Sequence, residues 1–455
     1  MQKENKMGYM PISKLVITMS LPMMASMLVQ ALYNVVDSIW VSRVCEEALT
    51  AVSLAFPLQN LLIGVATGTG VGINALLSRS LGEKNFEKAN SIAANGMFLA
   101  VVSTVVFFIF GLSCSGLFFQ TQVAKDNIIY TYGVDYITIC TCVSIGLFGQ
   151  IITERLMQAT GKTLLSMFTQ LIGAGINMIL DPLLILGVGP FPRLEVKGAA
   201  IATVFGQIVA FIVALILNKH FNKEIKLTWK GFKPNAKIIG EIYKIGVPSI
   251  IMVGVGSVMN YGLNKILLKF TETASAVFGV YFKLQSFVFM PIFGLNNGTI
   301  PIIAFNYGAR KKDRMVKTVK FSMILACSIM IVGTAAMWLF PETMLRLFDA
   351  SENMLSIGVP ALKTISLCFV SAGFSIAMGS VFQAIGKSHF SMFISFARQL
   401  IVLLPAAYLL SKTGVLDNVW WAFPIAEFVS LIVSSACYLY VYKTVVSKVG
   451  ENSDD

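Results

Sequence analysis

The chain has 455 residues, of which 56% are apolar and 13% charged, and its mean hydropathy is +0.75. So few polar residues cannot cover the surface of a soluble globule of this length, which excludes a soluble fold and predicts an integral membrane protein. The formal net charge is +12. Because the excess Lys and Arg residues lie in short segments between apolar runs, where anionic lipid attracts them, we expect no nucleic acid partner.

Long apolar runs recur along the chain, and a helix needs about 20 such residues to cross a bilayer. They predict twelve membrane-spanning helices, near residues 12–41, 51–78, 91–118, 128–155, 163–187, 198–218, 239–268, 276–307, 317–341, 354–384, 389–411 and 419–443. Several runs exceed the minimum length. This favours tilted or extended helices, or kinks at Pro22, Pro57, Pro182, Pro248 and Pro291.

The second half of the chain resembles the first. Pro22 returns as Pro248, and Gly72 returns as Gly298 at the same offset along the chain. The sequence QATGK at 158–162 returns as QAIGK at 383–387, at almost the same offset. These matches indicate a tandem duplication with six helices in each repeat.

Because six is an even number, both repeats enter the membrane from the same side. The predicted fold is an all-α integral membrane protein with twelve transmembrane helices in two parallel, pseudo-symmetric six-helix bundles. We place the bundles at 1–218 and 239–443, a cytoplasmic linker at 219–238 and a polar C-terminal tail at 444–455.

Lys and Arg residues gather on alternate loops. The basic loops contain Lys3, Lys6, Lys14, Lys84, Lys88, the run 219–237, Arg310, Lys311, Lys312 and Arg314. Such loops remain on the cytoplasmic side of a cell membrane. We therefore expect a multi-pass protein of the cell membrane with both termini in the cytoplasm.

Ionisable groups inside the bilayer are costly and mark functional sites. Of the 23 carboxylates, those retained well inside the predicted spans are Asp37, Asp181 and Glu427. Asp37 and Asp181 each lie about four to six residues before the outer end of an outward-running helix, about 6–9 Å from that end at about 1.5 Å per residue. We therefore expect the two to lie at the same depth in the first repeat.

Further polar residues surround these two aspartates. Gln30, Asn34 and Asp37 lie on one face of the first helix, Asn177 lies one turn before Asp181, and the next helix begins near Thr203. Carboxylate, amide and hydroxyl oxygens can hold protons or a small cation such as Na⁺, with Asp37 and Asp181 as its ligands, and a purely structural hydrogen-bond network is the alternative. The candidate ion-coupling residues are Asp37, Asp181, Asn177, Thr203 and Asn34.

Other candidates concern the substrate and the second repeat. Gln30, Tyr33 and Tyr136 are predicted to line a substrate cavity. Arg398 and Glu427 lie on helices adjacent in sequence, and we expect them to form a structural ion pair, because pairing lowers the cost of burying either charge.

Several motifs resemble the multidrug and toxic compound extrusion (MATE) family over nearly the whole chain. They are YNVVDSIWVS at 33–42, NMILDP at 177–182, GAAIAT at 198–203, the twin Gln-Ala-x-Gly-Lys motifs and WAFP at 421–424. The first-half acidic site of the bacterial DNA-damage-inducible branch matches Asp37, Asn177, Asp181 and Thr203. The second-half acidic site of another branch is not matched, because 248–256 and 354–384 contain no carboxylate there.

The resemblance implies a transporter, not an enzyme. It exports amphipathic, often cationic compounds against inward H⁺ or Na⁺ by alternating access, works as a monomer and needs no cofactor. A MATE-related flippase for a lipid-linked precursor and a channel or sensor are the alternatives. The acidic cluster argues against the flippase, and the presence of one polar stripe argues against the channel. An enzyme is least favoured, because no nucleophile–base pair, metal-binding set or phosphate-binding loop is evident.

Overall fold

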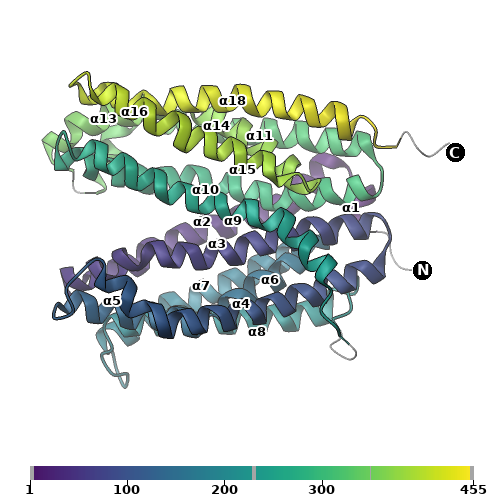
Figure 1. The fold of residues 1–455 in the computed structure, drawn as a ribbon, viewed down its shortest axis with the longest axis horizontal. Helices are drawn as coiled ribbons and strands as arrows, with labels where there is room; N and C mark the ends of the chain where they lie inside the picture. The colour runs from purple at the N-terminus through teal and green to yellow at the C-terminus, as the bar shows by residue number, and fades with distance from the viewer. Residues whose placement is uncertain (1–4, 228–231, 349, 451–455) are drawn as a thin grey trace. The chain divides into compact units, whose positions relative to one another are not determined.

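The computed structural model describes residues 5–227, 232–348 and 350–450. All regular structure in these ranges is helical (Figure 1), and the elements are α1 (Lys6–Tyr9), α2 (Ile12–Ser42), α3 (Glu46–Gly82), α4 (Phe86–Gln120), α5 (Ile128–Cys142), α6 (Ile145–Ala159), α7 (Thr163–Leu186), α8 (Val196–Phe221), α9 (Ala236–Leu267), α10 (Glu272–Gly308), α11 (Lys312–Leu339), α12 (Pro341–Arg346), α13 (Glu352–Ser366), α14 (Phe369–Ala384), α15 (Ser388–Phe396), η1 (Ala397–Leu403), α16 (Leu404–Ser411), α17 (Leu416–Trp420), α18 (Ala422–Val441) and η2 (Tyr442–Val446). Parts of the predicted N-terminal segment, linker and tail, at 1–4, 228–231 and 451–455, lie outside the described residues.

The predicted all-helical membrane fold is confirmed. Ten helical segments of the described chain are long and apolar enough to cross a membrane, and two bent helix pairs bring the number to twelve. The predicted spans 128–155 and 354–384 are not continuous helices. The first breaks by 46° between α5 and α6, and the second by 47° between α13 and α14.

The two breaks lie at equivalent places in the repeats and contain no proline. In the first repeat, Val143 leaves the helical region at φ −109° and ψ 35°. Beyond the break, Gly146 brings α6 against the backbone of α8, where an added Cβ would lie 2.7 Å from the amide nitrogen of Ile208. The missing side chain at Gly146 therefore permits close packing of α6 on α8 just beyond the bend. The five prolines considered as kink sites lie inside α2, α3, α7, α9 and α10.

The chain divides into two compact units. One is Ala25–Ile250, and the other combines Met1–Met24 with Ile251–Asp455. The two boundaries fall inside the first helix of each repeat, α2 and α9, and at matching positions, because Met24 and Ile250 each come two places after the paired prolines Pro22 and Pro248. Each unit therefore contains most of one repeat together with the first part of the other repeat's first helix.

Equivalent helices pack together within the two units. In Ala25–Ile250, α3 packs on α4 and α6, and α6 packs on α8. In the other unit, α10 packs on α11 and α14, and α14 packs on α18. Figure 1 shows the long helices of each unit running side by side. These shared contacts give the pseudo-symmetric bundles that the duplication predicts.

Glycines at matching positions allow the first parts of α2 and α9 to pack closely in the unit of the other repeat. In one unit, a Cβ added to Gly298 would lie 2.6 Å from Cα of Ser20, and one added to Gly294 would lie 2.6 Å from the amide nitrogen of Met24. In the other unit, Gly68 and Gly72 contact α9 in the same way. The missing side chains allow helix backbones to approach closely, as small residues do in membrane helix packing.

Replacing Gly298 by Val should therefore prevent α10 from packing on α2. Because the added atoms meet backbone and not a movable side-chain end, we expect a loss of stability above about 3 kcal/mol, beyond ordinary overpacking. Thermal unfolding followed by size-exclusion chromatography measures it. Gly279→Val on the same helix is the matched control, since a Cβ there meets nothing within 4 Å. Equal melting temperatures for the two variants would contradict the role of Gly298.

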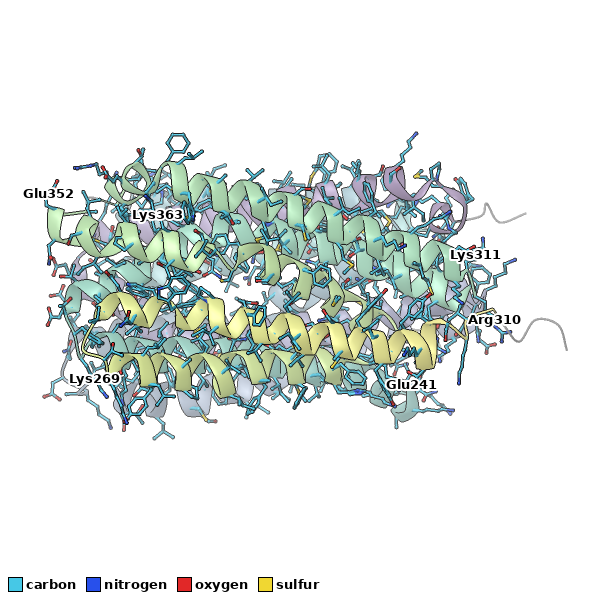
Figure 2. All side chains as sticks on the ribbon, turned by 90° about the horizontal axis from the view of Figure 1, so that it is seen from above. Glu241, Lys269, Arg310, Lys311, Glu352 and Lys363 are labelled. Atoms are coloured by element: carbon cyan, nitrogen blue, oxygen red, sulfur yellow. The ribbon has the colours of Figure 1, made fainter. Side chains whose placement is uncertain are left out.

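The ends of the second unit carry charge. Figure 2 shows Lys269 and Glu352 at one end of this unit and Arg310 and Lys311 at the other. Nζ of Lys311 donates to the Gly8 carbonyl at 2.9 Å. Nζ of Lys312 donates to the carbonyl of Ser447, near the C-terminal end of the described chain, at 2.8 Å. The N-terminal helix α1 and the segment after η2 therefore share the basic end of this unit.

Candidate ion and substrate site

The acidic site of the first unit is built on α7 and α8. Asp181 is fully buried on α7, Asn177 lies one turn before it, and Thr203 lies near the start of α8. Gly206 allows close contact between the helices, because a Cβ there would lie 2.7 Å from the Gly173 carbonyl. This close packing, one turn away from Asn177, places Thr203 opposite the amide.

Asn177 joins Thr203 to Asp181. The hydrogen-bond network is satisfied when the amide nitrogen donates to Oδ2 of Asp181 at 3.0 Å. The amide oxygen then accepts from the backbone N–H and the hydroxyl of Thr203, each at 3.1 Å. One oxygen of Asp181 is thereby oriented by a neutral donor, and no basic side chain of the described residues forms an ion pair with Asp181.

The side chains of Asp37 on α2 and Asp181 on α7 are close enough to interact electrostatically. Oδ1 of Asp37 is buried and has no hydrogen-bond partner among the described residues. Two carboxylates this close repel each other unless a proton or a cation lies between them. The two aspartates predicted to lie at one depth are thus near each other, and Oδ1 of Asp37 can accept an ion.

Two tyrosines border this pair. Tyr33 on α2 lies near Thr203 and both aspartates. Tyr136 on α5 is buried, and its hydroxyl accepts a hydrogen bond from Nε2 of Gln59 on α3 at 2.8 Å. Gln59 was not among the predicted site residues, although a glutamine within the apolar run 51–78 is a recognisable signal. Tyr33 from α2 and Tyr136 from α5 thus lie near Asp37, and Gln59 from α3 contacts Tyr136.

Two predicted residues are not brought into the cluster. Asn34 is exposed and Gln30 is half-buried. Among the hydrogen bonds of the described chain, none connects either side chain to Asp37, Asp181, Asn177 or Thr203. Helix α2 thus contributes Asp37 and Tyr33 to this site, and no contact within the described chain supports the assignment of Asn34 to ion coupling.

The MatE family model matches the chain twice, over residues 22–183 and 248–409. The chain belongs to the MatE family. The two matches begin at Pro22 and at Pro248, the prolines that the internal duplication pairs, and they cover stretches of equal length. The family predicted from the motifs is confirmed.

Similar proteins span nearly the same length as this MatE chain. The multidrug export protein MepA of Staphylococcus haemolyticus (strain JCSC1435) is 26% identical over 417 residues, with 91% of each chain covered. A crystal structure of MATE in complex with MaL6 is 25% identical, covers 98% of this chain and 100% of its own, and gives a TM-score of 0.91. A MOP superfamily transporter from Pyrococcus furiosus Vc1, described as having a binding pocket of reverse polarity, is 25% identical, covers 98% of this chain and 99% of its own, and also gives 0.91.

The oxygen atoms of this site can hold either a proton or Na⁺. A proton can be shared between the carboxyl groups of Asp37 and Asp181. Na⁺ would be bound by carboxylate oxygens, with Oδ1 of Asp37, which has no hydrogen-bond partner among the described residues, as one donor. The amide oxygen of Asn177 faces Thr203 in its satisfied orientation, so the amide orients Asp181 and is not itself a ligand in this arrangement.

A second buried carboxylate in the same unit differs in its partners. Glu154 on α6 accepts hydrogen bonds from Gln150 at 2.9 Å, Thr169 at 2.8 Å and Gln170 at 2.7 Å. Both of its oxygens are thus paired with neutral donors from α6 and α7, which makes a satisfied structural network. The contrast with the free oxygen of Asp37 separates the structural carboxylate from the candidate functional pair.

In the second unit of the MatE fold, Arg398 on η1 and Glu427 on α18 form an ion pair. Nη1 of Arg398 lies 2.8 Å from Oε1 of Glu427, and the side chains are 22% and 12% exposed. The sequence Ile-Ala-Glu at 425–427 aligns with Ile-Ala-Thr at 201–203, so Glu427 occupies the repeat position of Thr203. In the register that pairs Pro22 with Pro248, the position of Asp37 is taken by Leu263. At these two positions the second unit therefore has one carboxylate, Glu427, paired with Arg398, whereas the first unit has one, Asp37, that forms no ion pair within the described chain.

Proposed function

We propose that this protein exports amphipathic, often cationic compounds across the cell membrane by antiport with H⁺ or Na⁺ and alternating access. The proximity of Asp37 and Asp181 carries the proposal. One half-buried and one fully buried carboxyl group, with no ion-pair partner among the described residues, attract a proton, a metal cation or an organic cation. MatE membership and similarity to the staphylococcal multidrug export proteins support the assignment to multidrug efflux.

Antiport follows if the ion and the substrate compete for the same carboxylates. A bound organic cation then weakens binding of H⁺ or Na⁺, and the ion weakens substrate binding by the same factor. Tyr33 and Tyr136 offer apolar rings with polar hydroxyl groups beside the two acids, which suits amphipathic cations. We assign them to the substrate cavity.

We place both chain termini in the cytoplasm and take the monomer as the transporting unit. The basic residues Arg310 and Lys311 lie at the end of the second unit that contacts α1 and Ser447. The positive-inside tendency favours the cytoplasmic side for that end.

The polarity of the first-unit site favours export of cations over the flippase alternative. A lipid-linked phosphate would require a wide cationic cavity, whereas the first-unit site carries two carboxylates. Lys283 lies within a predicted span of the second repeat, and its Nζ is 5.9 Å from the centre of the Phe348 ring. This cation–π contact engages its charge.

The direct test uses purified protein in proteoliposomes, with an imposed pH gradient in Na⁺-free buffer or an imposed Na⁺ gradient in Na⁺-containing buffer of equal pH. We expect ethidium to dissipate the pH gradient without Na⁺ if H⁺ is the coupling ion. If Na⁺ is the coupling ion, ethidium flux requires a Na⁺ gradient instead. Absence of exchange in both buffers would contradict the proposed antiport and favour the flippase.

A further inference from the structure

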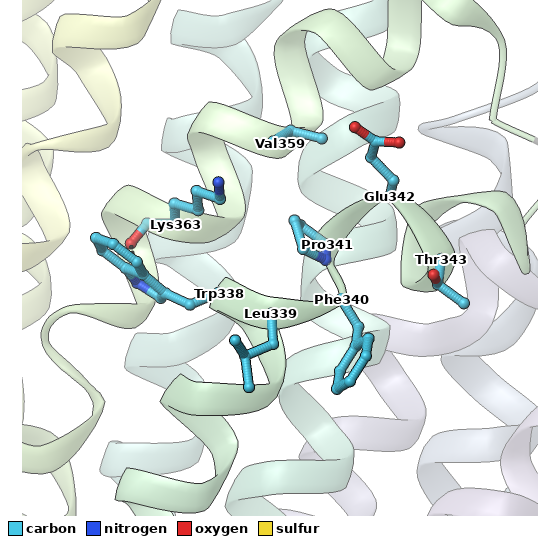
Figure 3. A pocket seen from close by; sticks show the side chains of 8 residues that line it. All are labelled: Trp338, Leu339, Phe340, Pro341, Glu342, Thr343, Val359 and Lys363. Atoms are coloured by element: carbon cyan, nitrogen blue, oxygen red, sulfur yellow. Dashed lines mark hydrogen bonds between the residues drawn. The ribbon is translucent and has the colours of Figure 1, made fainter.

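A cavity of about 270 Å³, open to the outside, lies at the surface of the second unit, where α11, α12 and α13 meet. Figure 3 shows its lining, which includes Trp338, Leu339, Phe340, Glu342 and Lys363. All of these residues belong to one compact unit and lie outside the acidic site. Enclosed sites for drug-sized ligands measure about 300–1,000 Å³, so the cavity suits a smaller group.

The cavity lies at the level of a membrane surface. Helix α11 begins at Lys312, at the basic end of the unit, and Trp338 is its last residue but one. At the rise of an α-helix, the two residues are about 39 Å apart along the axis. This length exceeds the hydrocarbon core, which is about 30 Å thick, so Trp338 reaches the interface on the far side. Its indole nitrogen donates to the Lys363 carbonyl at 3.1 Å, which holds the ring in the cavity wall.

Two opposite charges face this cavity without pairing with each other. Lys363 is half-buried and Glu342 is exposed. Within the described chain, neither side chain takes part in an ion pair or hydrogen bond. In the view of Figure 3 their charged ends lie on one side of the cavity, with Leu339 and Phe340 on the other. The cavity therefore has a charged side, formed by Lys363 and Glu342, and an apolar side, formed by Leu339 and Phe340.

Leu339 and Phe340 are 71% and 58% exposed. Apolar side chains so exposed beside an interfacial tryptophan are covered by lipid acyl chains in a membrane. An occupant that matches the whole cavity carries a negative and a positive group close together, and apolar chains next to them.

We propose that this cavity binds the headgroup of a phospholipid that joins a phosphate to a primary amine, as in phosphatidylethanolamine. The phosphate lies against the Lys363 ammonium, the lipid amine lies against the Glu342 carboxylate, and the acyl chains cover Leu339 and Phe340. Charge complementarity at both ends distinguishes this lipid from an anionic one, which Glu342 repels. The inference does not depend on the transported substrate or the coupling ion.

Thermal unfolding of delipidated full-length protein in detergent tests the proposal. At equal concentration, phosphatidylethanolamine is expected to raise the melting temperature more than phosphatidylglycerol, which has no cationic group for Glu342, and more than phosphatidylcholine, whose quaternary ammonium has no N–H to donate to that carboxylate. Lys363→Met should weaken phosphatidylethanolamine binding about tenfold or more, through loss of a charge-assisted contact with the phosphate. Glu342→Gln should remove the preference over phosphatidylglycerol. Lys363→Arg keeps the charge and should retain binding, which also shows that position 363 accepts substitution.

Lys412→Met is the matched control, because Lys412 is an exposed lysine of the same unit whose Nζ lies 4.9 Å from the Tyr408 ring, outside the cavity. It should keep the full phosphatidylethanolamine response. Stronger stabilisation by phosphatidylglycerol than by phosphatidylethanolamine, equal responses of Lys363→Met and wild type, or no response to any of the lipids would each overturn the proposal.

Discussion

Replacing Asp181 by Asn is expected to abolish ion-coupled export while leaving membrane insertion intact. The amide keeps the size of the carboxyl group and can still bond to Asn177, but it removes one of two charges that lie close together. Coupling between two ligands typically changes affinity by about 5–150-fold. We therefore expect ethidium flux in proteoliposomes to fall to the level seen without a gradient, and Asp37→Asn to behave alike.

Glu154→Gln is the matched control for this experiment. It neutralises another buried carboxylate in the same unit, but one whose oxygens are already paired with Gln150, Thr169 and Gln170. We expect lower thermal stability and retained gradient-driven exchange. Retained exchange in both Asp37→Asn and Asp181→Asn would refute the assignment of ion coupling to this pair.

Breaking the Arg398–Glu427 pair from one side should destabilise the protein more than removing both charges. Arg398→Met leaves Glu427 buried with both oxygens unpaired, and Glu427→Leu leaves a half-buried guanidinium without its partner. Loss of one partner of a buried ion pair costs about 3–5 kcal/mol, whereas apolar replacement of both is often close to neutral. Unfolding of the two single variants and the double variant in detergent measures the difference.

The double-mutant comparison also separates a structural pair from a transport site. Within this account, the double variant recovers stability and keeps substrate specificity. Losses of stability that simply add in the double variant would show that the two side chains do not depend on each other. A changed substrate range in a stable double variant would instead place the pair in the substrate site.

The carboxylate pair could be predicted from the sequence, because membrane depth follows from helix direction and residue spacing alone. Asp37 and Asp181 were placed at one depth, and Asn177 and Thr203 beside them, by counting from helix ends. Asn34 shares a helix face with Asp37 at i and i+3, but the face is broad, and the side chain remains outside the cluster. Gln59 was missed because no partner for it is visible until α3 packs on α5.

Two features of the fold could not be predicted from the apolar runs. They are the bends within two spans and the packing of the first part of α2 and of α9 in the unit of the other repeat. The sequences 128–155 and 354–384 remain apolar through their breaks, and neither break contains a proline. The duplication shows which residues are equivalent but not which pack together. Residues of α2 up to Met24 pack in the unit of the second repeat, because Gly294 and Gly298 admit their backbone.

The central claim is that ion and substrate compete for Asp37 and Asp181. The most direct measurement is the proton or Na⁺ released when ethidium binds to purified wild-type protein in weakly buffered detergent solution, followed by a pH indicator and a Na⁺-selective electrode. This account predicts release of one of these ions with wild type and no release with Asp37→Asn. Ethidium binding of unchanged affinity across pH and Na⁺ concentration, with no ion released, would contradict it.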